Sequence, residues 1–234
     1  MLTLLLMVAC SLQAADDVDA ALAKFRAAMN KAKSPSEQSA AILDLRGMPD
    51  EKTLAVLTPF VTAGAWAVRK NAIHTVAGFY DFRKKVVPIL LNSLNANNSE
   101  PNAVAAALEA LGKLEDSSVV AVVYRYFSHN NIFVARAAVQ AVGNLPKTSS
   151  IEPLLQNLKA QEKALANAGS GRVGPVVSSP TGGSIKPDAS IRKNAETLIA
   201  ETNSSLTKIT KQDFKTSADW QKWWDANKST FKTD

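Results

Sequence analysis

The segment Val68-Arg-Lys-Asn-Ala72-Ile-His-Thr-Val-Ala77 contains the pattern that decides the fold. Its last six residues belong to a register that starts with alanine and recurs along the chain. The other copies are Ala41-Ile-Leu-Asp-Leu-Arg46, Ala107-Leu-Glu-Ala-Leu-Gly112, Ala138-Val-Gln-Ala-Val-Gly143 and the weaker Ala195-Glu-Thr-Leu-Ile-Ala200. The starting alanines lie 31, 35, 31 and 57 residues apart. A recurrence at this distance indicates a repeat architecture, in which each repeat is one small structural unit.

Each period predicts two helices. In residues 68–76 the apolar positions are i, i+4, i+5 and i+8, which is the stripe of an amphipathic helix. A break follows at residues 78–81, and residues 82–95 carry a second apolar stripe. The third period repeats the two stripes. Because a single helix pair cannot bury its apolar face, each pair needs its neighbours in the chain.

Residues with known preferences for helix ends mark where the helices start. Asp50, Asp81 and Ser117 are predicted N-caps, and Pro101 is expected in the first turn of a helix. No segment alternates polar and apolar residues over the length of a strand. The sequence therefore predicts an all-α fold.

The pattern Val-Arg-x-x-Ala-[Ile/Val]-x-x-[Leu/Val]-Gly, followed by a second helix within 31–35 residues, resembles HEAT repeats. It is especially similar to the short bacterial type, also called the phycobilisome-lyase-like repeat. The resemblance covers about residues 36–205 and is broken once; the first copy departs from it with Arg46, where a small residue is usual. It implies a right-handed α-solenoid of about five HEAT-like helix pairs with N- and C-terminal capping helices. It also implies that Arg69 makes a contact between repeats and that the chain supplies an interaction surface.

The first fifteen residues are predicted to be a signal sequence. The run Leu2–Val8 is apolar but too short to span a bilayer, and small residues and an acidic cluster follow it. Met7-Val8-Ala9-Cys10 resembles a lipoprotein box, in which Cys10 is lipidated, whereas cleavage after Ala14 would release the chain without a lipid. Both readings predict an exported protein, periplasmic or anchored to the membrane as a lipoprotein. A buried N-terminal helix of a cytoplasmic protein is the alternative.

Residues 16–205 form the predicted solenoid. Its first helix, residues 16–33, is expected to cap the first pair, and residues 169–187 are a Gly- and Pro-rich insertion expected to be flexible. Residues 206–234 form a Trp-rich segment similar to the ending of secreted bacterial HEAT-repeat proteins of unknown role. Its three tryptophans share one helical face and are expected to dock on the last repeat; anchoring a partner or a membrane is the alternative.

Few residues are suited to catalysis or metal binding. One cysteine and two histidines in 234 residues exclude a disulfide framework and leave no set of metal ligands. Residues 169–174 fit G-x-G-x-x-G, but a predicted helix precedes them and Pro175 follows, which is the wrong context for a dinucleotide site. We expect no catalytic, cofactor-binding or metal-binding residues and no enzyme activity.

The chain has a net charge of +6, and residues 64–96 hold +4 of it. Five basic residues there stand against Asp81 alone: Arg69, Lys70, Arg83, Lys84 and Lys85. Such a patch suits an acidic partner, nucleic acid or anionic lipid among them. Nucleic acid is not favoured, because a DNA-binding solenoid would spread its basic residues over several repeats and the third and fourth repeats are near neutral.

The sequence thus favours a non-catalytic HEAT-repeat scaffold that binds another protein in the bacterial cell envelope. The residues expected to bind that partner lie on second helices and combine charge with aromatic area: Lys84, Lys85, Tyr124 and Arg125. Contact with a membrane is expected only through a lipid on Cys10. Two alternatives are a nucleic-acid-binding HEAT protein that uses the basic second repeat, and an accessory subunit of a lyase-type enzyme.

Overall fold

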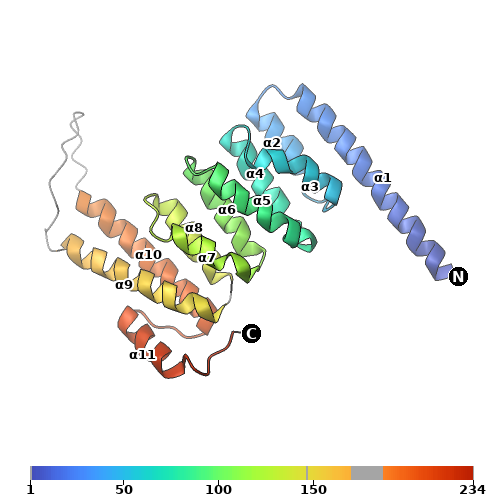
Figure 1. Cartoon of the computed structure of the whole chain (residues 1–234). Coiled ribbons are helices and arrows are strands. Elements are labelled where there is room, and N and C mark those ends of the chain that lie inside the picture. Colours follow the sequence, from blue (N-terminus) through green and yellow to red (C-terminus); the bar gives the residue numbers. More distant parts are fainter. Residues whose placement is uncertain (1, 146, 170–186, 234) are drawn as a thin grey trace, which may run out of the picture. The chain divides into compact units, whose positions relative to one another are not determined.

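A computed structural model of the chain describes residues 2–145, 147–169 and 187–233. These residues form eleven α-helices and five short 3-10 helices, with no strand among them. The chain divides into two compact units, Met1–Leu114 and Glu115–Asp234. Figure 1 shows the helices of each unit following one another in sequence order. The all-α prediction is confirmed.

The first unit contains six α-helices and two 3-10 helices. They are α1 (Leu2–Lys31), α2 (Pro35–Asp44), α3 (Glu51–Leu57), η1 (Thr58–Val61), α4 (Trp66–Ala77), η2 (Tyr80–Phe82), α5 (Arg83–Ala96) and α6 (Pro101–Lys113). The second unit contains the remaining elements. They are η3 (Ser117–Val119), α7 (Val120–Val123), η4 (Tyr124–Tyr126), α8 (Ile132–Gly143), η5 (Thr148–Ser150), α9 (Ile151–Gly169), α10 (Pro187–Thr210) and α11 (Ser217–Asn227).

The recurring alanines lie on the first helix of each pair, α2, α4, α6, α8 and α10. All five are buried, and none is more than 3% exposed: Ala41, Ala72, Ala107, Ala138 and Ala195. In the first unit α4 packs against both α2 and α6, and in the second unit α10 packs against α8. A small side chain at the contact lets neighbouring helices approach closely, which is why the register begins with alanine.

Each second helix packs against the first helix that follows it. The 3-10 helix η1, which extends α3, packs on α4; α5 packs on α6; and α9 packs along α10. The helices are thus packed in sequential pairs within each unit, which is the arrangement expected of a HEAT-repeat solenoid.

Two of the predicted helix starts are confirmed. Asp50 caps α3, and its Oδ1 accepts a hydrogen bond of 2.7 Å from the backbone N–H of Lys52. Pro101 lies in the first turn of α6, where its lack of an N–H group costs nothing.

The other two predicted caps are wrong. Asp81 lies inside η2, which runs directly into α5. The backbone N–H of Arg83, the first residue of α5, therefore donates to the carbonyl of Tyr80 in that 3-10 turn and not to the side chain of Asp81. Ser117 is one residue too late. Asp116 is the cap, and its Oδ1 accepts a hydrogen bond of 2.9 Å from the N–H of Ser118.

The N-terminal helix α1 caps the first unit. It packs against α2 and α3, and it buries Leu22 and Phe25, as expected for residues 16–33. Phe25 meets Phe60 of η1 edge to face, with ring centroids 5.9 Å apart. The helix extends back to Leu2 through the predicted signal sequence, which stays a prediction. Within the part of the chain that the structure describes, we find no helix with the length and apolar character needed to cross a bilayer.

The C-terminal helix α11 packs on α9, which confirms the capping helix at this end. Trp220 and Trp224 are buried, and both lie in a cluster with Trp223, Phe214 and Phe231. Trp220 and Trp224 therefore face inward, while Trp223 is half-buried. Between α9, which ends at Gly169, and α10, which begins at Pro187, the predicted insertion lies outside the described residues.

Candidate interaction surfaces

Lys84 and Lys85 lie in the first turn of α5, in the first unit, and both are exposed. Lys85 is paired: its Nζ lies 2.5 Å from Oε1 of Glu51, at the start of α3. An exposed ion pair of this kind contributes about 0–1 kcal/mol, so Lys85 can exchange Glu51 for a partner's carboxylate at little cost. Lys84 makes no ion pair with any residue that the structure describes.

Tyr124 and Arg125 lie in η4, in the second unit. The hydroxyl of Tyr124 donates a hydrogen bond of 2.9 Å to the carbonyl of Ser149, and its ring meets Phe127 edge to face at 5.5 Å. Burial raises the pKa of Tyr124, so this phenol stays protonated and keeps its donor role. Tyr124 therefore joins η4 to η5, whereas Arg125 is exposed.

Tyr126 and His129 form an aromatic pair beside Arg125 that the sequence analysis did not single out. Their rings stack with centroids 6.3 Å apart and an angle of 25° between planes. His129 Nδ1 accepts a hydrogen bond of 3.0 Å from the N–H of Asn131, which fixes the ring. The four predicted partner-binding residues thus divide equally between the two units. In each unit one makes a contact within the chain, and the other is exposed and forms no ion pair with a residue that the structure describes.

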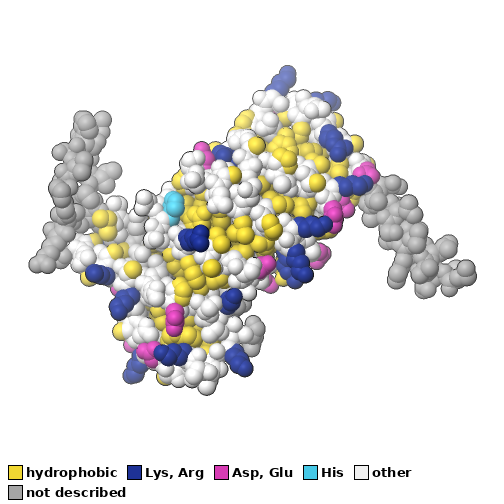
Figure 2. Space-filling model, in the orientation of Figure 1, with side chains coloured by type: hydrophobic (Ala, Val, Ile, Leu, Met, Phe, Trp, Pro, Cys, Tyr) yellow, Lys and Arg dark blue, Asp and Glu magenta, His cyan; other side chains and the backbone are white. Residues whose placement is uncertain are grey.

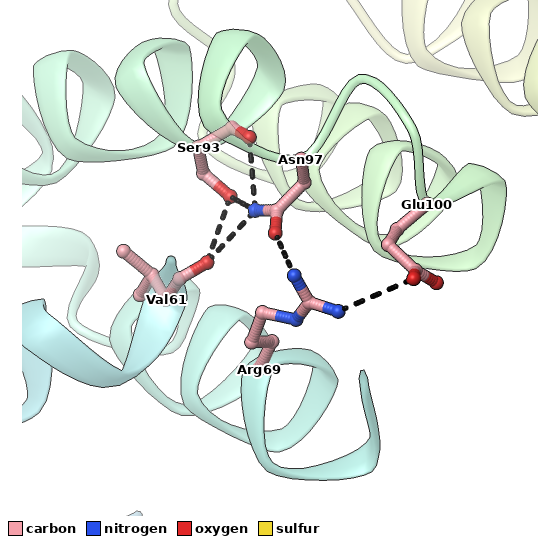
Figure 3. Close-up of polar contacts among 5 residues, drawn as sticks. All are labelled: Val61, Arg69, Ser93, Asn97 and Glu100. Carbon is pink, nitrogen blue, oxygen red and sulfur yellow. Dashed lines mark hydrogen bonds and ion pairs between the residues drawn. The ribbon is translucent and has the colours of Figure 1, made fainter. Parts of the chain in front are cut away.

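Arg69 belongs to the predicted basic patch, but its side chain contacts polar groups within the first unit (Figure 3). Its Nη1 donates to Oδ1 of Asn97 at 2.8 Å, and its Nη2 lies 3.8 Å from Oε1 of Glu100, just before α6. The side chain is only 15% exposed. Because α4 carries Arg69 and Glu100 precedes the next first helix, this is the contact between repeats that the resemblance implied.

Asn97 is the centre of this network, and it is fully buried at the end of α5. Its Nδ2 donates at 2.9 Å to the carbonyl of Val61 at the end of η1 and to Ser93 of its own helix. Ser93 Oγ also donates to the carbonyl of Val61, at 3.2 Å. Figure 3 shows these groups converging from η1, α4 and α5. The network therefore fixes the positions of three elements relative to one another.

The remaining members of the basic patch are dispersed. Lys70 Nζ lies 5.9 Å from the ring of Trp66, and Arg83 lies 4.8 Å from the ring of Tyr80 at the opposite end of α4. Acids from outside residues 64–96 pair with two of the five cations, namely Glu51 with Lys85 and Glu100 with Arg69. On the face drawn in Figure 2, lysines and arginines stand singly around apolar areas. This arrangement gives the nucleic-acid alternative less support than the sequence did.

A second group of charges surrounds His74 on the first helices of the first unit. Lys70 lies one turn before it on α4, Glu109 and Lys113 are on α6, and Arg46 follows α2. Burial lowers the pKa of His74, and the nearby cations, Lys113 foremost, lower it further, whereas Glu109 opposes them. His74 is half-buried at the boundary between core and solvent. The cations around it come from three repeats, so their positions in the sequence do not group them.

His74 makes stability depend on pH. Its pKa in the folded chain lies below the ordinary histidine value of about 6.5, so the unfolded chain binds the proton more readily, and stability is lost as the pH falls below that value. We expect His74→Gln to reduce this loss in the first unit. The measurement is the opening free energy of α4 amides by hydrogen exchange, between about pH 7.5 and 5. His129→Gln is the control and should leave the loss unchanged; an unchanged loss in His74→Gln would contradict the assignment.

No group of three or more His, Cys, Asp or Glu side chains is placed to hold a metal ion in the described parts of the chain. Cys10 lies in the first half of α1, and its lipidation stays a prediction.

The comparisons with known proteins agree with this architecture over part of the chain. Residues 87–169 match the family model of HEAT repeats. The matched segment runs from within α5 to the end of α9 and includes two copies of the alanine register, those that start at Ala107 and Ala138. No curated protein matches the chain. HEAT repeats usually serve as scaffolds that bind other proteins, so the match indicates a protein partner in general terms.

Proposed function

We propose that this chain is a non-catalytic scaffold of the bacterial cell envelope that binds a protein partner through its HEAT repeats. The observation that carries the proposal is the match of residues 87–169 to HEAT repeats, together with the sequential packing of helix pairs. The 31–35-residue spacing of the uninterrupted repeats supports assignment to the short bacterial type. Repeat stacks of this kind present extended surfaces for binding.

The partner-binding residues that we propose are Lys84, Lys85, Tyr124 and Arg125. Lys84 and Arg125 are exposed and free to meet a partner, and Arg125 lies beside the stacked pair Tyr126 and His129. Arginine and tyrosine are among the residues most often found to dominate binding energy at interfaces. Lys85 and Tyr124 are each held by a contact within their own unit, with Glu51 and Ser149 respectively.

The test uses a photo-crosslinking residue at position 84 or 125, with position 222 on α11 as the control, in cells that produce the full chain. A protein crosslinked at 84 or 125 and not at 222 is then purified, and its affinity for the chain is measured. We expect replacement of all four residues by alanine to weaken binding about tenfold or more. The control variant Lys222→Ala/Lys228→Ala should bind like the original chain. Unchanged affinity in the variant with all four residues replaced would reject them as the partner-binding residues.

We also propose that the chain is exported and is either periplasmic or anchored through a lipid on Cys10. The apolar run Leu2–Val8 and the segment that ends at Cys10 support this localisation. The test is the intact mass of the protein recovered from each cell fraction. Loss of the nine residues before Cys10 with added acyl mass indicates a lipoprotein, and loss of about fourteen without it indicates a periplasmic protein. An intact chain in the cytosol would reject both.

A further inference from the structure

The cations around His74 form a surface that the proposed function does not use. We name it the His74 face and define it by Arg46, Trp66, Lys70, His74 and Lys113. It lies on or next to the first helices α2, α4 and α6, whereas Lys84 and Lys85 lie on a second helix. Because α4 packs against both α2 and α6, these side chains belong to three adjacent repeats of one compact unit.

The positive charge of this face is not balanced within the chain. Arg46, Lys70 and Lys113 are exposed, and none of them forms an ion pair with another described residue. Four other cations of the unit are paired: Lys24 with Asp44, Lys52 with Asp19, Arg69 with Glu100 and Lys85 with Glu51. Glu109 is the acid that acts on His74. The face therefore has an excess of positive charge that a partner's acidic groups would complement.

Trp66 gives the same face an exposed aromatic surface. Its side chain is 46% exposed, the second largest exposure among the large hydrophobic residues described, and Lys70 Nζ lies 5.9 Å from its ring. An indole beside cations suits a protein segment that presents carboxylates together with an apolar side chain. Tryptophan and arginine are among the residues that most often dominate binding energy at protein interfaces.

We propose that the His74 face binds an acidic segment of a protein partner. The inference rests on the proposed scaffold function only in that the partner is a protein. The His74 face does not include Lys84 or Lys85. Nucleic acid is the less suitable ligand, because proteins that hold it commonly neutralise about 6–10 phosphates and this face offers three fixed cations.

His74 links this binding to pH. Near neutral pH the imidazole is neutral, because burial and the cations Lys113, Lys70 and Arg46 lower its pKa. Glu109 has the opposite effect. A bound carboxylate favours the imidazolium form, so the complex takes up a proton as it forms. Affinity should then increase as the pH falls, by at most about tenfold per pH unit.

The experiment uses the full chain and a short synthetic peptide of glutamate, glycine and one phenylalanine, with a glutamine peptide of the same length as control. Because the chain has two histidines, the ring proton signals of His74 and His129 can be assigned with His129→Gln. We expect the glutamate peptide to shift the His74 signal and raise its titration midpoint. We expect Lys70→Glu/Lys113→Glu to weaken binding about tenfold or more, and raised salt to weaken it in the original chain.

The matched control is Lys31→Glu/Lys33→Glu, which reverses two exposed charges of the same unit, at the last residue of α1 and just after it. It should bind the glutamate peptide within about twofold of the original chain. Absence of binding, or equal losses in the two double variants, would overturn the His74 face and leave the proposed function to its own crosslinking test. Tighter binding of an oligothymidylate than of the glutamate peptide would overturn it in favour of nucleic acid.

Discussion

Replacing Trp220 by alanine should destabilise the C-terminal end of the second unit by about 3–5 kcal/mol. Trp220 is fully buried, and its ring meets Phe214 edge to face at 5.0 Å and Trp223 at 6.3 Å. Its indole Nε1–H donates a hydrogen bond of 2.8 Å to Oδ1 of Asn203 on α10. The substitution removes the largest fully buried side chain described and leaves a cavity between the C-terminal segment and the α9–α10 pair.

The remaining contacts of α11 would not replace Trp220. Glu162 of α9 accepts hydrogen bonds from the backbone N–H of Ser217, at 2.8 Å, and from its hydroxyl. Trp224 Nε1 lies 3.4 Å from Oε1 of Glu152, which is a weak bond. A hydrogen bond contributes about 1 kcal/mol net, and the 3.4 Å bond less, so the three bonds to Glu162 and Glu152 amount to about 2–3 kcal/mol, at or below the contribution of the buried indole. We therefore expect α11 to separate from α9 before the rest of the unit unfolds.

Hydrogen exchange in α11 and thermal unfolding of the full chain measure this effect. Lys222→Ala, on the exposed side of the same helix, is the matched control and should change stability by less than about 0.5 kcal/mol. Trp220→Phe keeps an aromatic ring but loses the bond to Asn203, so its effect should fall between the two. A loss of less than about 1 kcal/mol in Trp220→Ala would contradict the inward, core-closing role of the tryptophans.

The stacking of first helices could be predicted from the sequence because it depends on local spacing. An alanine followed by apolar residues at helical intervals marks the buried side of each first helix, and all five alanines are buried, including the weak copy at Ala195. Caps were less predictable. Whether Asp81 caps a helix depends on whether a 3-10 turn precedes α5, and the residue types at 80–82 do not determine that turn.

The candidate surfaces were harder to predict, because charge counted along a segment omits acids that the fold brings in. Lys85 meets Glu51, which is 34 residues earlier in the chain, and Arg69 meets Glu100, which lies outside the basic segment. Tyr124 meets Ser149, 25 residues later. The cations of the His74 face are likewise dispersed over three repeats, and only the packing of α2, α4 and α6 brings them together. The helical spacing of Lys70 and His74 was the one local signal for that face.

Replacing Gly143 by alanine should destabilise the second unit by about 2 kcal/mol. A Cβ at position 143, the last residue of α8, would lie 2.5 Å from Oγ, 2.7 Å from Cβ and 2.9 Å from Cα of Ser205 on α10. A rotation of the serine side chain relieves only the first of these contacts, so α10 itself would have to move. Inserting atoms into such a contact costs about 1–3 kcal/mol, and the contact with backbone places this site at the upper end.

An opposing effect is smaller. Alanine is favoured over glycine in a helix by about 0.5–1 kcal/mol, which reduces the penalty but does not cancel it. Moving α10 would also weaken the buried hydrogen bond of 3.0 Å that Ser205 Oγ donates to the carbonyl of Val139 on α8. The contact that closes the α8–α10 packing thus requires a residue without a side chain at position 143.

Denaturant unfolding of the full chain, with hydrogen exchange in α8 and α10, measures the expected loss. Gly47→Ala is the matched control, because a Cβ there meets nothing within 4 Å, and it should change stability by less than about 0.5 kcal/mol. If Gly143→Ala were as stable as Gly47→Ala, α10 would tolerate the added atom by sliding on α8. The close approach of the first helices α8 and α10 would then not be what fixes the pairing of their two repeats.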